Sequence, residues 1–466
     1  MRKRREMKMV VLKACILLSL VLGQATVGWS KPEVPNPLQA NAQGTSACSD
    51  PCKAVTDASA LSKEIALAGK STGWVQLMPS RYMCLQQTLK GLRKTGIPLV
   101  GDTSDGLAPA EHGDDAGLFY FVPWFANSFG LNLDKAIDVF LGGILVIAFL
   151  AGTSGLFLFL TNWPSRILAL LGMFWVARAS FNVGDIYLVQ SSVVMALVPW
   201  FLYLSRERKL SRGLAVFAFF AGLCAAVSNQ IRGQSGTAVL LWGLCIIAFY
   251  LNCSRTRKLL LMGVLFAGCL IPTVYFHEVL ARRNNFLTHT TLQTIELSGR
   301  HVIWSPIYLG FGFLSNELVP AFLDPVAAHK VASISPGVPY LSDEYEGILR
   351  KEVFSLIRHH PSFVVETLAA KMGVICLRLL VCANVGLLAA ALYSKSWPIE
   401  VAFWLAIGFN SLFGLLVMPI SNYLLGFIAF GTLYALVSID HALEVRANRQ
   451  VEEVPGRWLR RTVCAG

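Results

Sequence analysis

Apolar runs of similar length recur along this chain and alternate with polar segments. The runs lie at about 10–29, 137–160, 167–183, 187–204, 213–229, 236–253, 259–276, 372–393, 399–419 and 421–438. Each is close to the roughly 20 residues that an α-helix needs to cross about 30 Å of hydrocarbon. The pattern predicts an all-α polytopic membrane protein with about ten transmembrane helices.

Two long polar segments interrupt the series and set the domain organisation. They would form two large extracytoplasmic loops, and the apolar runs on either side would form the membrane domain. We expect an N-terminal transmembrane helix (or signal peptide) at 1–29, the first loop at 30–136, helices 2–7 at 137–276, the second loop at 277–371, helices 8–10 at 372–438 and a cytoplasmic tail at 439–466.

Both alternatives for the first segment stay open. The apolar run after Lys13 is about as short as a signal-peptide core. We favour an uncleaved helix, because the fold proposed below needs one there. Within the loops, apolar and polar spacing predicts short helices at 58–68, 82–93 and 347–359, and one more leading through Glu366 to Lys371.

Composition and charge agree with a membrane protein. The chain is 55% hydrophobic and only 15% charged, against roughly 25% charged residues in soluble domains. The net charge is +12, but no basic stripe is interleaved with aromatic residues, so we expect no nucleic-acid partner. The basic residues gather in short segments between apolar runs, at 2–5, 206–212, 255–258 and 446–461.

Clusters of Lys and Arg mark the cytoplasmic side of a membrane protein. This rule places both termini in the cytoplasm and the two long loops outside. Acidic residues such as Asp115, Asp185 and Glu346 then fall in the outside loops. Asp114 and Asp115, immediately before the helix that enters the membrane, are the first candidates for chemistry.

Several functions are open to this carboxylate pair. It is either a solvated loop pair, a general base toward an acceptor hydroxyl or amine, or a ligand for Mg²⁺ or Mn²⁺ against a diphosphate. Other candidate substrate-binding residues share the same predicted face. They are Asp185, Tyr187, His301, Trp304, Tyr308, Asn316, Asp324, Tyr345 and Glu346.

Some of these residues have plain structural readings as well. His301 would ligate a metal or bind a phosphate, or it is simply solvated. Trp304 and Tyr308 would stack on a sugar, or they belong to the aromatic belt of the membrane interface.

Arginines near the same face need partners, because a guanidinium in hydrocarbon costs roughly 2.5–3.5 kcal/mol on insertion scales. Arg178 and Arg378 lie within apolar runs, and Arg232 lies at the end of one. Arg178 and Arg378 would pair with Asp185 or with the Asp114–Asp115 carboxylates, or reach the headgroups. Alternatively, they would hold a lipid-linked phosphate through a bidentate fork.

Four short stretches, taken in order, carry a family resemblance. They are Asp114 to Tyr120 with Pro123, Phe129 to Leu131, Gly184 to Tyr187, and Ile231 to Gly233. With the long exported loop before the second span, they resemble the C-type (GT-C) membrane glycosyltransferases, in the branch of protein O-mannosyltransferases and lipid A aminoarabinose transferases.

The resemblance implies a GT-C-like fold in a bacterial inner membrane. It also implies transfer of a sugar from a polyprenyl-phosphate donor to an envelope lipid, glycan or protein on the extracytoplasmic face. Asp114 or Asp115 would be the catalytic base, and Arg178, Arg232 or Arg378 would hold the donor phosphate. Membrane lipids would surround the protein.

Other functions fit the same topology. A polysaccharide ligase or polymerase would depend on Arg282, Arg283 and His301 instead of the Asp pair. A transporter or flippase would show internal repeats and charges near the middle of the membrane, and we find no repeat. A non-catalytic scaffold of envelope assembly would tolerate exchange of both aspartates for asparagine.

Overall fold

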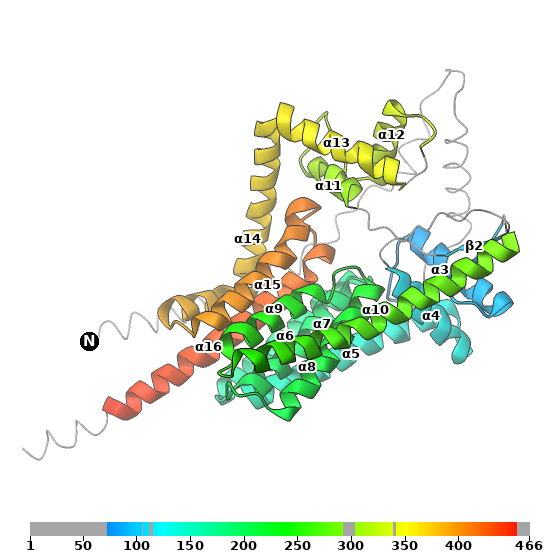
Figure 1. Ribbon diagram of the computed structural model, residues 1–466. Helices are drawn as coiled ribbons and strands as arrows, with labels where there is room; N and C mark the ends of the chain where they lie inside the picture. The colour runs from blue at the N-terminus through cyan, green and yellow to red at the C-terminus, as the bar shows by residue number, and fades with distance from the viewer. Residues whose placement is uncertain (1–71, 105, 111–114, 292–302, 339–341, 454–466) are drawn as a thin grey trace, which may run out of the picture.

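The computed structural model describes residues 72–104, 106–110, 115–291, 303–338 and 342–453 (Figure 1). The predicted helices at 10–29 and 58–68 lie outside the described residues. So do Asp114 and His301. Among the described residues, the chain is helical except for one two-stranded hairpin.

Eight helices in the described part of the chain are long and apolar enough to cross a membrane. They are α5 (Leu133–Phe159), α6 (Trp163–Val183), α7 (Leu188–Ser205), α8 (Arg212–Ile231), α10 (Arg255–Thr291), α14 (Pro361–Leu392), α15 (Trp397–Leu416) and α16 (Leu425–Glu453). The shorter α9 (Thr237–Cys245) continues as a π-helical turn, Ile246–Tyr250. These elements cover each predicted run from 137–160 onward and confirm an all-α polytopic membrane protein.

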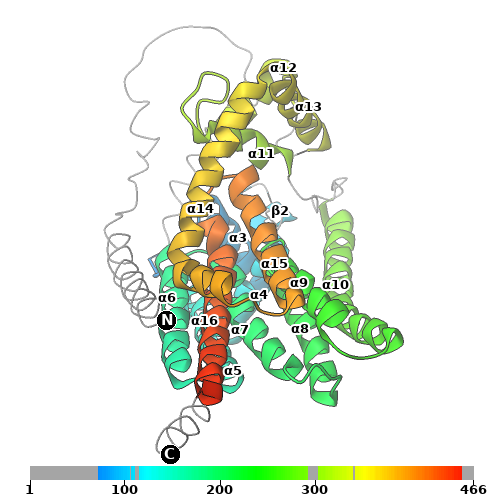
Figure 2. The ribbon, with the colours of Figure 1, turned by 90° about the vertical axis from the view of Figure 1, so that its left-hand side faces the viewer.

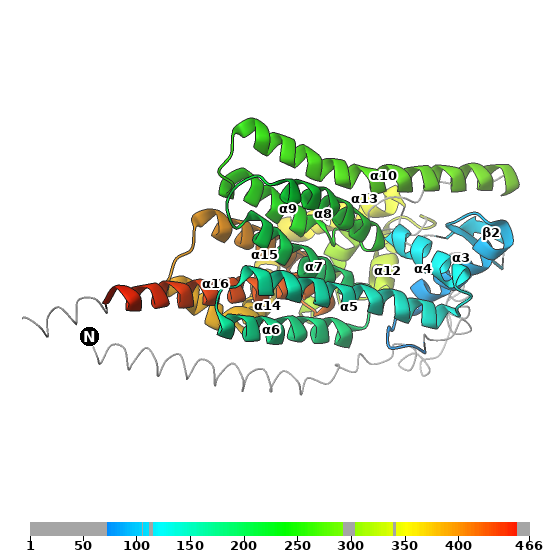
Figure 3. The ribbon, with the colours of Figure 1, turned by 90° about the horizontal axis from the view of Figure 1, so that it is seen from below.

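Three helices, α10, α14 and α16, extend well beyond their predicted apolar runs, and α16 continues to Glu453 in the predicted tail. α10 has 37 residues, which at 1.5 Å per residue is about 55 Å, longer than the hydrocarbon core. Figure 3 shows it running along one side of the bundle as far as the hairpin. α14 begins at Pro361, so the short helix expected before Lys371 is its first part. Hydropathy identifies only the apolar part of a helix, whereas the backbone hydrogen bonds of the helix continue into the polar residues beyond that part.

The bundle is centred on α7 and α16. About 78% of the apolar window of α7 and 83% of that of α16 is buried inside the protein, against 17% for α14. A Cβ atom on Gly386 would lie 2.1 Å from the Cα atom of Ala435, so α14 approaches α16 at glycine distance. The helices α7 and α16 form the core, and most of the apolar surface of α14 is not covered by the protein.

The basic connections meet at one end of the bundle. The backbone N–H of Asn252, after α9, donates to the carbonyl of Arg208, after α7, at 2.7 Å. Asn162, between α5 and α6, donates from Nδ2 to the Asp440 carboxylate of α16 at 3.0 Å. Lys395, between α14 and α15, forms a 2.8 Å ion pair with Glu400. The loops predicted to be cytoplasmic therefore lie together.

A small unit precedes the first described span at the opposite end. It consists of α3 (Pro79–Thr95), the hairpin strands β1 (Val100–Thr103) and β2 (Gly106–Pro109), and α4 (Ala116–Ser128). In the antiparallel hairpin, Val100 pairs with Pro109 and Thr103 with Gly106. α3 starts three residues before the predicted helix at 82–93 because Pro79 occupies its first turn, where proline needs no N–H partner.

A second unit lies beyond the ends of α14 and α15 (Figure 2). It contains α11 (Trp304–Gly310), the 3₁₀ turn Phe311–Phe313, α12 (Asp324–Ile334) and α13 (Asp343–His359). Its own apolar core includes Tyr308, Leu349 and Val353. α13 begins earlier than the predicted 347, because the Ser342 side chain caps it by accepting the N–H of Tyr345 at 3.2 Å.

Candidate functional site

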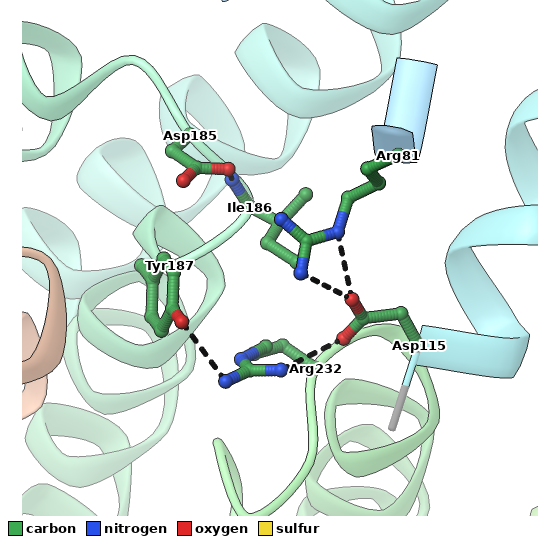
Figure 4. Close-up of polar contacts among 6 residues, drawn as sticks. All are labelled: Arg81, Asp115, Asp185, Ile186, Tyr187 and Arg232. Atoms are coloured by element: carbon green, nitrogen blue, oxygen red, sulfur yellow. Dashed lines mark hydrogen bonds and ion pairs between the residues drawn. The ribbon is translucent and has the colours of Figure 1, made fainter. Parts of the chain in front are cut away.

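The Asp115 carboxylate lies between two arginine side chains at the start of α4 (Figure 4). Arg81 donates from Nε to Oδ2 at 2.8 Å, and its Nη2 lies 2.8 Å from the same oxygen. Arg232 donates from Nη1 to Oδ1 at 3.2 Å. The Asp115 side chain is only 1% exposed. Both of its oxygens are therefore engaged by charged donors, away from water.

Tyr187 extends this network on the side of Arg232. Arg232 donates from Nη2 to the Tyr187 hydroxyl at 2.9 Å, and its guanidinium carbon lies 4.6 Å from the centre of the Tyr187 ring. The ring of Tyr423, at the start of the last span, meets that of Tyr187 edge-on with centroids 5.0 Å apart. Hydrogen bonding and cation–π contact together orient the Arg232 fork.

Asp185 adds a second buried carboxylate to the site. It lies in the short turn between α6 and α7 and is 6% exposed, and its Oδ1 accepts the N–H of Ile186 at 2.6 Å. It forms no ion pair with another described residue. Burial raises the pKa of Asp185 above its usual value, while the nearby positive charge of Arg81 opposes this shift. A carboxyl in this environment holds its proton more readily than one in water.

Two close backbone approaches hold these side chains together. A Cβ atom on Gly117 would lie 2.6 Å from the backbone carbon of Gln230, so α4 rests directly on the end of α8 and brings Asp115 to Arg232. Gly184 takes the left-handed conformation (φ 56°) that ends α6 before Asp185. Its carbonyl accepts the N–H of Gln76 at 2.7 Å, which fixes the chain just before α3 and Arg81.

The charges of the cluster favour an anion. Two guanidinium groups share the Asp115 carboxylate, and burial raises the pKa of the neighbouring Asp185. Nη1 of Arg81 is buried and has no hydrogen-bond partner among the described residues. Paired arginine forks match the geometry of carboxylate and phosphate oxygens. The arrangement can therefore bind a phosphate group next to a carboxylate.

The structure brings together four residues that the sequence analysis singled out, namely Asp115, Asp185, Tyr187 and Arg232. The sequence did not indicate Arg81 or Tyr423. Arg81 is 34 positions from Asp115 along the chain and lies at the edge of a predicted surface helix. A buried arginine in an exported loop needs an acidic partner, which gives a reason to look for one. The residues around Arg81 in the sequence show neither that it is buried nor which residue is its partner.

Arg178 and Arg378 do not join the site. Arg178 is exposed on α6, and Arg378 is half-buried on α14. Neither forms an ion pair or hydrogen bond with another described residue, so the expected pairing with Asp185 or Asp115 does not occur. Arg81 and Arg232 occupy the positions around Asp115 instead, because α3 and the end of α8 approach it more closely than do the membrane-embedded parts of α6 and α14.

Residues predicted from the second loop support the α11–α13 unit. The Glu346 carboxylate accepts the backbone N–H groups of Ile303, Trp304 and Ser305 at 2.9, 2.7 and 3.1 Å and caps α11. Asn316 closes its own loop by donating to the carbonyl of Val319 at 3.0 Å and accepting the N–H of that residue at 2.6 Å.

Aromatic residues of the same prediction belong to the core of this unit. Tyr308 and Tyr345 are each 2% exposed, and burial raises the pKa of Tyr345 to about 12. Asp324 is the first residue of α12. Trp304 is half-buried and lies under the guanidinium of Arg350, with 5.6 Å between the guanidinium carbon and the ring centre. Packing and capping therefore account for most of the second-loop candidates.

A divalent cation fits the described part of the site poorly. Both oxygens of Asp115 already accept hydrogen bonds from guanidinium groups, whose charges would repel Mg²⁺ or Mn²⁺. Among the described residues, no three His, Cys, Asp or Glu side chains gather at metal-binding distance. The described side chains of the site therefore suit an anion better than a divalent cation.

Comparison of the chain with protein-family models, with curated proteins and with solved structures gives no match.

Proposed function

We propose that the protein is a membrane glycosyltransferase. It moves a sugar from a polyprenyl-phosphate donor to a lipid, glycan or protein acceptor of the envelope, on the extracytoplasmic face of a bacterial inner membrane. The observation that carries this proposal is the buried Asp115 carboxylate held between Arg81 and Arg232 at the end of a polytopic bundle. Such a cluster combines a potential base with potential phosphate ligands.

The orientation of the bundle follows from its charges. Basic residues lie in the loops between α7 and α8 and between α14 and α15, and Arg166 lies in the first turn of α6, at the end opposite to Asp115. The positive-inside rule assigns that end to the cytoplasm. The cluster then faces the outside, where lipid-linked sugars serve as donors because nucleotide sugars are absent.

The proposed reaction needs one base and one anion site. Asp114 or Asp115 removes the proton of the acceptor hydroxyl, and the oxygen attacks the anomeric carbon of the donor with inversion. The bond between the anomeric carbon and the phosphate oxygen breaks, and its electron pair goes to the phosphate. Arg232 and Arg81 stabilise the negative charge on the leaving polyprenyl phosphate. The products are the glycosylated acceptor, the lipid phosphate and a protonated carboxyl.

Variants of the two aspartates test this reaction in cells that lack the native gene. Asp114→Asn, Asp115→Asn and the double variant are produced at equal levels, and lipid-linked sugars and envelope glycans are compared by mass spectrometry. We expect one glycan to disappear and its lipid-linked donor to accumulate. The accumulating species identifies the sugar.

A matched control lies at the other end of the bundle. Glu400→Gln weakens the ion pair with Lys395 and the hydrogen bond donated by Tyr434 at 2.8 Å. It therefore disturbs a polar cluster of similar kind without touching Asp115, and it should leave the glycans unchanged. Normal glycans in the double aspartate variant, where deletion of the gene alters them, would contradict the proposed mechanism and favour a transporter or scaffold.

A further inference from the structure

We infer that Arg81 and Arg232 form a phosphate-binding site that Asp115 closes in this structure, and that a bound phosphate ester of a lipid releases this carboxylate. The inference rests on the proposed function, in which both arginines bind the donor phosphate. It adds that the availability of Asp115 depends on phosphate binding.

Asp115 contacts the two arginines as an anionic ligand would. One carboxylate accepts three contacts from two guanidinium groups, at 2.8, 2.8 and 3.2 Å. A phosphate group has more oxygens than a carboxylate and satisfies two arginine forks more fully. Arg81 still has a buried Nη1 with no hydrogen-bond partner among the described residues. An additional acceptor oxygen would remove the cost of that unsatisfied donor.

The three charged side chains of the cluster differ in their exposure to solvent. The side chain of Asp115 is 1% exposed, that of Arg81 9% and that of Arg232 18%. A ligand therefore reaches Arg232 first. Arg232 also makes the longest of the three contacts with Asp115, at 3.2 Å. The outermost contact is the one that an entering phosphate displaces most easily, while Tyr187 keeps the guanidinium in place at 2.9 Å.

Asp185 is a second carboxylate near Arg81. Asp185 is buried close enough to Arg81 for the charge of each to affect the other, but it forms no ion pair with a described residue. When Asp115 leaves, an entering phosphate supplies the negative charge beside Arg81 and Arg232. Neither guanidinium is then left as an isolated buried charge.

This arrangement has a mechanistic consequence. A carboxylate that accepts bonds from two guanidinium groups is a weak proton acceptor, because those bonds stabilise its charged form. Phosphate binding takes the arginines and frees the carboxylate. The base is then available only when the donor is bound, which prevents the transfer site from activating acceptor or water before the donor arrives.

Binding of a short polyprenyl phosphate to the purified protein tests the inference. Farnesyl phosphate, farnesol and inorganic phosphate are titrated in detergent, and dissociation constants are measured by calorimetry. We expect Asp115→Asn to lower the Kd for farnesyl phosphate about tenfold, because it removes a competing charge-assisted bond. Arg81→Gln should raise that Kd about tenfold. A purely structural role for Asp115 predicts weaker binding in both variants.

A second pair of variants covers the case in which Asp115→Asn does not fold. Arg81→Lys and Arg232→Lys retain the positive charge and one contact with Asp115 but lose the planar fork. Each should raise the Kd for farnesyl phosphate about tenfold while the protein stays monodisperse. Unchanged affinity in both lysine variants would overturn the inference. So would weaker binding in a folded Asp115→Asn protein.

The three ligands separate the possible sources of the phosphate. Tighter binding of farnesyl phosphate than of inorganic phosphate supports a lipid-linked ligand. Equal binding of the two, with the same response to the variants, supports the anion site and assigns it to free phosphate. Binding of farnesol as tight as farnesyl phosphate would overturn the inference, since the chain alone would then be recognised. Glycan profiles report separately on the proposed function, so either idea can fail without the other.

Discussion

Asp115 and Arg232 form a 3.2 Å ion pair between the start of α4 and the end of α8, although they are 117 positions apart in the chain. The pair joins an exported segment to the membrane bundle. Arg81 reaches the same carboxylate from α3, so three separate elements meet at one buried charge.

Removing the guanidinium of Arg232 should destabilise the protein. Arg232→Gln leaves the buried Asp115 with only Arg81 as a charged partner and deprives the Tyr187 hydroxyl of its donor. We expect a loss of about 1–3 kcal/mol, measured by thermal unfolding in detergent. Tyr187→Phe removes only the hydroxyl group and should cost about 1 kcal/mol. Equal effects of the two variants would show that the bond to Asp115 contributes little.

Adding a methyl group at Gly117 should disturb the site through the packing of α4 against the end of α8. In Gly117→Ala the new Cβ would lie 2.6 Å from the backbone carbon of Gln230, which cannot move as a side chain can. We expect a cost of about 1–3 kcal/mol from this overpacking. Gly143→Ala on α5 is the matched control. No atom lies within 4 Å of its Cβ, so it should be neutral or slightly stabilising. Similar unfolding temperatures for both variants would disprove the close approach.

Loss of the Glu346 carboxylate should loosen α11 without unfolding the bundle. Glu346→Ala removes the acceptor for three backbone N–H groups at the helix start. We expect a local cost of about 1–2 kcal/mol, seen as faster hydrogen exchange in residues 303–310. Glu344→Ala removes an exposed carboxylate from the same helix and should leave that exchange unchanged. Faster exchange across α7 in Glu346→Ala would mean that the unit and the bundle unfold together.

The pH dependence of stability should change in Asp185→Asn. Burial, opposed by Arg81, raises the pKa of Asp185 above its usual 3.8. Between that value and the raised pKa, the folded protein binds more protons at this carboxyl than the unfolded chain does. The contribution of Asp185 to stability therefore falls as pH rises through this window. Asparagine cannot ionise, so the variant should gain stability relative to the parent protein as pH rises.

The measurement is the difference in unfolding temperature between Asp185→Asn and the parent protein, taken from about pH 4 to about pH 7. Asp115, Arg81 and Arg232 surround Asp185 and are present in both proteins, so their own titration largely cancels in the difference. A fall in the unfolding temperature of the variant relative to that of the parent protein as pH rises would contradict the raised pKa. A constant difference would show that folding does not shift the pKa of Asp185.

Membrane topology could be predicted because its main cause is local. Each apolar run from 137–160 onward coincides with a described helix, since transfer into lipid depends on the composition of about 20 consecutive residues. The same reasoning placed Asp115, Asp185 and Arg232 toward one end of the bundle, because successive spans alternate in direction. It also identified α13 from its apolar spacing.

The helix ends and the site itself were decided only by tertiary structure. The sequence did not show that α10 continues to Thr291, because a polar helical extension resembles a loop in hydropathy. It offered Arg178 and Arg378 as partners for the acidic residues, whereas Arg81 and Arg232 hold Asp115. Ion pairing depends on distance in space. That distance is set here by helix packing, such as Gly117 against Gln230, which no local pattern encodes.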